Sequence, residues 1–228
     1  MSGDVHGVWA IVPVKTFARA KQRLAAVLSA QERAALAEAM LYDVLDALAP
    51  VPQLEGIAVV TADPLAAQIA RSFGARHVPD AVESGVNEAV LQGLDAVRSA
   101  KSAVTVIAAD VPFATPTEIA AALGGLAHDP VLLAPAQADG GTNLLAQRRA
   151  GMIEPCFGER SFARHLEQAR TRNLRCGVVK AAGLDHDIDR PGDLFAPTGF
   201  GANRVTTLLA DINVERRLEA IAEQRQSA

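Results

Sequence analysis

The chain has 228 residues, of which 50% are hydrophobic and 4% aromatic, and its formal net charge is -4. This length fits one large domain. A net negative charge argues against a general nucleic-acid-binding protein, which needs a basic surface to neutralise phosphates. An anionic ligand must therefore be bound by a local cluster of positive charge.

The N-terminus and the cysteines give a first expectation about location. The apolar stretch of residues 8–14 is short and runs directly into Lys15, unlike a signal peptide. No stretch reaches the roughly 20 apolar residues of a membrane span. Cys156 and Cys176 are too few for a disulfide framework and are expected as reduced thiols. We therefore expect a cytoplasmic protein that binds neither membranes nor nucleic acid.

Short apolar runs alternate with helical stretches along the chain. The runs that predict strands are residues 8–14, 56–61, 76–79, 104–109, 131–134, 143–146 and 176–179. The stretches that predict helices are residues 30–48, 64–73, 87–100, 115–126 and 162–172. Ser29 with Glu32, and Thr115 with Glu118, supply the N-cap and N3 residues of two of these helices. Apolar strands separated by helices indicate an α/β fold with a parallel sheet covered on both faces.

The last part of the chain, residues 198–228, looks like an extension appended to a domain of residues 1–197. It begins with glycines at 199 and 201 and continues into a charged helix predicted for residues 214–224. This tail helix is a candidate contact for a homodimer.

Ligands of parallel sheets bind beyond the carboxyl ends of the strands. The residues that follow each predicted strand are therefore the first candidates for a binding site. Lys15, Lys21 and Arg23 follow the first strand. Three cations in such a loop can hold a triphosphate, although a solvated basic loop shows the same pattern. The loop lacks the glycines of a Walker sequence and is not a P-loop.

Three aspartates are candidate ligands of a hard cation such as Mg²⁺. Asp110 ends the fourth predicted strand, where a carboxylate can bind a metal or serve as a turn residue or helix cap. Asp187 and Asp189 lie two apart in an extended segment, so their side chains point to one face and can share one metal. Asp189 has the alternative interpretation of a cap for a helix that begins near Pro191.

Three loops carry the remaining candidates, and a plain capped turn explains each equally well. Adjacent glycines at 140 and 141 let the backbone approach a ligand, and Thr142 adds a hydroxyl. Gly158 and Ser161 open the helix of residues 162–172, where Ser161 is a candidate cap and a candidate anion ligand. In the loop of residues 83–87, Asn87 either caps its helix or reads a base. His165, on a predicted helix, is expected at the surface.

Seven motifs occur in a fixed order over roughly residues 8 to 195. They are Pro13-Val14-Lys15, Ala20-Lys21-Gln22-Arg23-Leu24, Leu28-Ser29-x-x-Glu32-Arg33-Ala34, Ala109-Asp110-Val111-Pro112, Gly141-Thr142-Asn143, Phe157-Gly158-x-x-Ser161-Phe162 and Asp187-Ile188-Asp189-x-Pro191-x-Asp193-Leu194. Each is weak alone, but the ordered set resembles the phospholactate and phosphoenolpyruvate guanylyltransferases of coenzyme F-420 biosynthesis.

The resemblance implies a three-layer, Rossmann-like nucleotidyltransferase fold with a mostly parallel central sheet. It implies transfer of GMP from GTP to 2-phospholactate, phosphoenolpyruvate or 3-phosphoglycerate, with Mg²⁺ as cofactor and pyrophosphate as the second product. The implied metal carboxylates are Asp110, Asp187 and Asp189. The implied phosphoacid-binding residues are Thr142, Gly158 and Ser161. The residues implied in nucleotide binding are Lys15, Lys21, Arg23 and Asn87, and the catalytic set is Asp110 with the three cations.

The chain departs from the family pattern at one loop. The usual Gly-Leu-Asn is Gly85-Val86-Asn87 here, preceded by Glu83-Ser84 instead of a glycine-rich run. Guanine specificity is therefore open, and a cytidylyl- or uridylyltransferase on the same fold is one alternative. A non-catalytic nucleotide-binding module whose tail recruits a partner is the other, although such a module has no need of three acids.

Overall fold

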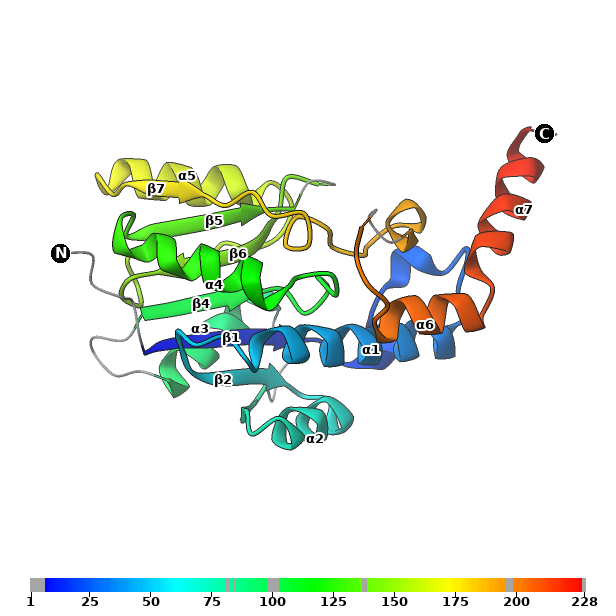
Figure 1. Cartoon of the computed structure of the whole chain (residues 1–228), viewed down its shortest axis with the longest axis horizontal. Coiled ribbons are helices and arrows are strands. Elements are labelled where there is room, and N and C mark those ends of the chain that lie inside the picture. Colours follow the sequence, from blue (N-terminus) through cyan, green and yellow to red (C-terminus); the bar gives the residue numbers. More distant parts are fainter. Residues whose placement is uncertain are drawn as a thin grey trace.

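The computed structural model describes residues 7–80, 83, 85–97, 103–136, 139–195 and 199–226. Within them, seven strands form one sheet in the order β3-β2-β1-β4-β6-β5-β7 (Figure 1). The strands are β1 (Val8–Val14), β2 (Leu54–Thr61), β3 (Arg76–Pro79), β4 (Ala103–Ile107), β5 (Val131–Pro135), β6 (Thr142–Gln147) and β7 (Cys176–Val178). Both Ser84 and the expected domain boundary at residues 197 and 198 lie outside the described residues.

The sheet is mostly parallel, as predicted, and β6 is the described strand that runs against the others. It pairs antiparallel with β4 and with β5, while the remaining pairs are parallel. The connection from β5 to β6 is too short for a parallel crossover, which needs a dozen or more residues. It turns at Gly140, whose φ is +71°. Because β6 is reversed, its first residue lies at the edge where the parallel strands end.

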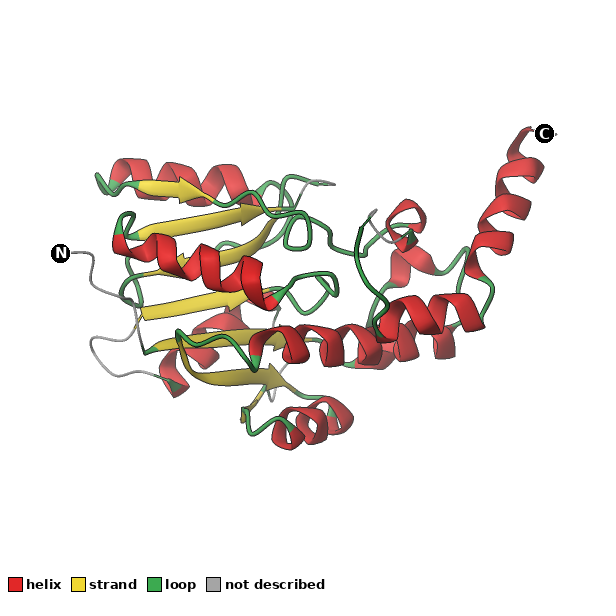
Figure 2. Ribbon diagram, viewed as in Figure 1, coloured by secondary structure: helices red, strands yellow, loops and turns green. Residues whose placement is uncertain are grey.

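Helices cover both faces of this sheet and give three layers (Figure 2). The helices are α1 (Ala30–Leu48), α2 (Pro64–Ser72), α3 (Val86–Ala96), α4 (Pro116–Gly124), α5 (Ser161–Thr171), α6 (Arg204–Asp211) and α7 (Val214–Gln226). One buried cluster joins α1, α2, α4 and α6 to one face of the sheet, and a second joins α3 and α5 to the other. Both predicted capping boxes, at Ser29 and at Thr115, are confirmed.

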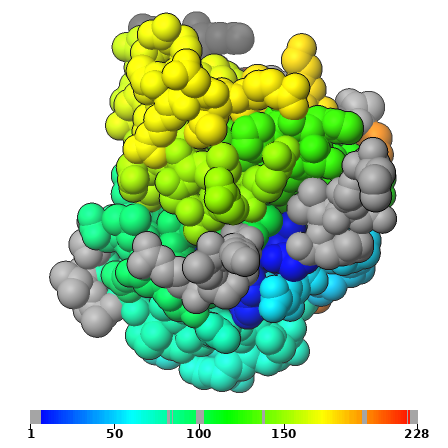
Figure 3. Space-filling model, turned by 90° about the vertical axis from the view of Figure 1, so that its left-hand side faces the viewer, coloured from blue at the N-terminus to red at the C-terminus, as the bar shows by residue number. Residues whose placement is uncertain are grey.

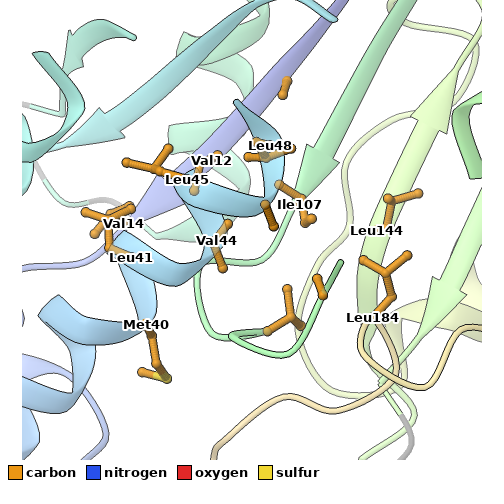
Figure 4. Close-up of a cluster of buried hydrophobic side chains, with 14 of the residues drawn as sticks. Val12, Val14, Met40, Leu41, Val44, Leu45, Leu48, Ile107, Leu144 and Leu184 are labelled. Atoms are coloured by element: carbon orange, nitrogen blue, oxygen red, sulfur yellow. The ribbon is translucent and has the colours of Figure 1, made fainter. Parts of the chain in front are cut away.

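The longest helix, α1, packs across the sheet centre. Apolar side chains along one side of α1 point toward β1 and β4 (Figure 4). The side chains that meet there include Val12, Leu41, Val44, Leu45 and Ile107, all fully buried. Alternate residues of β1 face opposite clusters, because successive side chains of a strand point to opposite faces. This central position fixes where the loop after β1 emerges.

Helix α6 was not predicted from the sequence, and it belongs to the main core. Val205 and Leu209 on α6 are buried in the same cluster as α1. The Asp43 carboxylate of α1 accepts the backbone N–H groups of Arg204 and Val205 at 3.1 and 3.0 Å. Asn203 caps α6 and donates to the Pro112 carbonyl at 2.8 Å. The final helix, α7, extends from the body beyond α6 (Figure 1).

The two edges of the sheet, and the side on which its parallel strands end, can be followed in Figure 1 and Figure 3. From the side where the parallel strands begin, the yellow segments near α5 and β7 lie at one edge and the cyan segments near α2 and β3 at the other (Figure 3). The strands end on the opposite side, near α6 (Figure 1).

Among the described residues, no helix combines the length and apolarity needed to cross a bilayer.

Two helical glycines give a matched test of packing between α3 and the sheet. A Cβ at Gly93 would lie 2.6 Å from Ile11 Cγ2 and 2.9 Å from Val60 Cγ2, both on stiff β-branched side chains. We expect Gly93→Ala to lower the free energy of unfolding by about 1–3 kcal/mol. A Cβ at Gly124 meets no atom within 4 Å. Gly124→Ala should therefore raise the free energy of unfolding by up to about 1 kcal/mol, because alanine favours a helix more than glycine does. Urea denaturation of both variants measures this, and equal effects would contradict the packing.

Candidate active site

A cavity of about 630 Å³ opens at the carboxyl edge of the sheet. Eight of the residues singled out in the sequence line it: Lys15, Lys21, Arg23, Asp110, Thr142, Gly158, Asp187 and Asp189. Asn87 and Ser161 do not line it, although both bond to residues at its rim. Segments far apart in the chain therefore supply one common site.

The loop after β1 is held by side chains from other elements so that its cations face the cavity. The buried Phe17 donates its backbone N–H to the Asp63 carboxylate at 2.9 Å. Glu83 accepts from the Thr16 N–H at 3.2 Å and from the Thr16 hydroxyl, and it pairs with Arg19 at 2.9 Å. The sequence analysis did not single out Asp63, which also caps α2, and it gave no sign that Glu83 contacts this loop.

Lys21 is the central cation of the site. Its Nζ lies 2.6 Å from Asp110 Oδ2 and 2.8 Å from Asp189 Oδ1, and its side chain is only 7% exposed. Burial acts to lower the pKa of Lys21, but the two carboxylates outweigh it and hold the pKa above its ordinary value. Arg23 adds a contact of 3.2 Å to Asp189 Oδ2. The φ of Lys21 is +52°, an uncommon backbone for a non-glycine residue.

Asp187 and Asp189 differ in charge environment although they lie two residues apart. Burial, followed by the nearby Asp110 charge, raises the pKa of Asp187 to about 6. Burial also acts to raise the pKa of Asp189, but Lys21 leads a group of cations that holds it below its ordinary value. A backbone bond of 3.0 Å from Ile188 N–H to the Asp110 carbonyl places this segment beside Asp110. Asp189 is not the cap of the turn at Pro191–Leu194, because Arg190 occupies the N-cap position and the Asp189 carboxylate contacts Lys21 and Arg23 instead.

The three aspartates line one cavity, but their side chains are not arranged as a set of metal ligands. Within the described ranges, no three or more His, Cys, Asp or Glu side chains are arranged to hold a metal ion. The Lys21 ammonium stands between Asp110 and Asp189 and pairs with both. Asp187 accepts from the Asn143 amide at 3.2 Å, and no described lysine or arginine pairs with it. Oxygen donors of the kind that Mg²⁺ prefers are thus present, and the Lys21 ammonium lies between two of these carboxylates.

Two of the predicted loop residues serve structural contacts. The Asn87 amide bonds the Phe157 backbone in both directions, at 3.2 and 2.6 Å, and so ties α3 to the loop before α5. Ser161 is fully buried and donates to the Thr142 hydroxyl at 3.1 Å. The expectation that His165 lies at the surface is wrong, because it is fully buried and lies 3.0 Å from the Thr142 hydroxyl. Its i,i+4 spacing from Ser161 was the available signal.

Known proteins resemble this chain along most of its length. A family profile described as "Guanylyl transferase CofC like" matches residues 8–214. A phosphoenolpyruvate guanylyltransferase of Sphaerobacter thermophilus is 38% identical over 204 residues, covering 87% of this chain and 98% of the relative. A 3-phospho-D-glycerate guanylyltransferase of Phenylobacterium zucineum is 38% identical over 215 residues, covering 92% and 99%.

A solved structure supports the fold. The crystal structure of a 4-diphosphocytidyl-2C-methyl-D-erythritol synthase superposes with a TM-score of 0.56 at 14% identity, covering 82% of this chain and 94% of the other. At that identity the likeness concerns the fold alone. It confirms the predicted nucleotidyltransferase architecture.

The unpaired charge of Asp187 predicts a stability gain when it is removed. Its pKa is raised from 3.8 to about 6 in the folded protein. Ionisation of Asp187 therefore lowers the free energy of unfolding as the pH rises through that interval. Asp187→Asn should therefore stabilise the protein at pH 8 by on the order of 2 kcal/mol, and the gain should vanish toward pH 4. Chemical denaturation at both pH values measures it.

Asp189→Asn is the matched control, because the pKa of Asp189 is lowered in the fold and its charge stabilises the protein above its ordinary pKa. This variant should lose stability at pH 8. A loss in both variants at that pH would contradict the assignment of Asp187 as the uncompensated acid.

Proposed function

This chain belongs to the family of CofC-like guanylyltransferases, and we propose that it transfers GMP from GTP to the phosphate of a three-carbon phosphorylated carboxylic acid. Phosphoenolpyruvate and 3-phosphoglycerate are the two acids of this class that its relatives' names carry, at equal identity. The observation that carries the proposal is a single cavity that is lined both by cations from the β1 loop and by Thr142 and Gly158.

The cations supply the binding of the triphosphate. Lys15, Lys21 and Arg23 line the cavity beyond the end of β1. Charge-assisted hydrogen bonds from such groups bind phosphate oxygens strongly and stabilise charge on departing pyrophosphate. Lys21 has Asp110 and Asp189 as partners in the free protein, so its contact with phosphate replaces contacts that it already makes.

Asp110, Asp187 and Asp189 are the residues that would hold Mg²⁺. The fit rests on their chemistry: three carboxylate donors share one cavity, and in the part of the chain that the structure describes no lysine or arginine pairs with Asp187. A bound Mg²⁺ supplies electrostatic stabilisation of charge on the phosphate oxygens. The protein's own part is to gather the three carboxylates in one cavity.

The acceptor needs little activation. A phosphate monoester is already anionic at neutral pH, so its oxygen can attack the α-phosphorus without a strong general base. Positioning and electrostatics then supply most of the catalysis. Thr142 and the Gly158 backbone hold the acid, and the strand-end cations hold the nucleotide. Among the described residues, no histidine or cysteine lines the cavity as a candidate catalyst.

A direct assay tests the proposed reaction. The full-length protein is incubated with Mg²⁺, one nucleotide (GTP, CTP or UTP) and one acid (phosphoenolpyruvate, 3-phosphoglycerate or 2-phospholactate). Pyrophosphate release and the mass of the product are then measured. We expect turnover with GTP and with one of the first two acids. Faster turnover with CTP or UTP would indicate the alternative nucleotide, and no pyrophosphate release with any pair would leave only a binding module.

Asp110→Asn tests the carboxylate assignment. The change keeps the shape of the side chain but removes a charge that lies 2.6 Å from Lys21 Nζ. We expect kcat to fall by on the order of 100-fold or more, as for the loss of a major electrostatic contributor. Circular dichroism should confirm an intact fold. An unchanged kcat would refute the assigned role of Asp110.

A further inference from the structure

A buried histidine stands directly behind the cavity wall at Thr142. His165 and Ser161 lie one turn apart on α5, and both are fully buried. Their side chains converge on the hydroxyl of Thr142, the first residue of β6, at 3.0 and 3.1 Å. Thr142 itself lines the cavity and is 6% exposed. The hydroxyl is therefore the link between a buried network and the ligand space.

One contact fixes the tautomer of His165. The backbone N–H of Cys156 donates to His165 Nε2 at 3.0 Å. A backbone N–H is a donor only, so Nε2 must be the unprotonated nitrogen of a neutral ring. Burial, with a smaller contribution from Arg164, lowers the pKa of His165 to about 4, which keeps the ring neutral at pH 7. The proton of the neutral imidazole therefore lies on Nδ1.

The tautomer in turn orients the Thr142 hydroxyl. Nδ1–H donates to Thr142 Oγ1, and the Ser161 hydroxyl donates to the same oxygen. A hydroxyl oxygen accepts two hydrogen bonds and donates one. With both acceptor positions filled from α5, Thr142 has only its own hydrogen to offer, and the cavity is the side that remains.

We propose that His165 is a positioning residue that makes the Thr142 hydroxyl an obligate hydrogen-bond donor toward the phosphorylated acid. An unconstrained hydroxyl can either donate or accept, so it discriminates weakly between ligand groups. A fixed donor instead selects an acceptor-only group, which at neutral pH means a carboxylate or phosphate oxygen. This inference rests on the proposed function and adds a determinant of specificity for the acid.

Two substitutions of His165 separate the two nitrogens. The amide of Asn reaches the position of Nδ1 and can still donate to Thr142. The amide of Gln reaches the position of Nε2 and can still accept from Cys156. We expect His165→Gln to raise the KM for the acid by on the order of tenfold or more, as for loss of a bond to a charged group. His165→Asn should keep that KM within about threefold, since it retains the donor, and the KM for GTP should change little in both.

A double-mutant cycle with Thr142→Val distinguishes action through the hydroxyl from general support of the fold. Thr142→Val removes the hydroxyl at nearly constant volume, and Thr142→Ser restores it as a control. If His165 acts through Thr142, His165→Gln lowers kcat/KM for the acid in the wild-type background and not in the Thr142→Val background. Equal losses in both backgrounds would overturn the proposal.

The tautomer itself can be observed without turnover. Long-range ¹H–¹⁵N spectra of the ¹⁵N-histidine-labelled protein at pH 7, assigned by comparison with His165→Asn, should show His165 protonated on Nδ1. Protonation on Nε2 would overturn the proposal even in an active enzyme. Absence of guanylyl transfer in the wild type would instead reject the proposed function and leave the tautomer result standing.

Discussion

The site depends on one buried ammonium group held between two carboxylates. Lys21 comes from the loop after β1, Asp110 from the loop after β4, and Asp189 from a segment nearly eighty residues further along the chain. A lysine that is almost wholly buried needs such partners, because an unpaired charge in the protein interior is costly. The two ion pairs therefore connect three segments that lie far apart in the chain.

Among the described residues, Lys21 and Arg23 pair with Asp189, and no lysine or arginine pairs with its neighbour Asp187. Burial, followed by the Asp110 charge, keeps the pKa of Asp187 raised, whereas the cations hold the pKa of Asp189 low. Local destabilisation of this kind is common where a protein binds a charged ligand, since binding supplies the missing charge. The surroundings of Thr142 are different. There the donors and acceptors are matched in a neutral network that reaches back into α5. Charge thus governs the part of the cavity around Lys21 and the aspartates, and hydrogen-bond direction governs the part around Thr142.

Much of the frame could be predicted because it depends on local patterns. The capping residues Ser29 and Thr115 begin α1 and α4 as their spacing indicates. The apolar runs of the central strands β1, β4, β5 and β6 are buried on both faces, while the edge strands β3 and β7 are partly exposed. The reversed direction of β6 follows from a short turn, which the glycines at 140 and 141 signalled. Helix α6 was missed although Asn203 and Thr206 form a local capping box; the further caps from Asp43 on α1, more than 150 residues away, leave no local pattern.

The sequence by itself determined the succession of the strands and of the described helices other than α6, the family, and eight of the residues that line the cavity. These follow from side-chain periodicity and from motifs that need only neighbouring residues. Only the tertiary structure decided how the same residues are partnered. It placed Lys21 between two of the three acids, turned Asn87 toward the Phe157 backbone, and buried His165 behind Thr142. Partnership and burial depend on atoms brought together from distant parts of the chain, and the charge and hydrogen-bonding direction of each group depend on that neighbourhood.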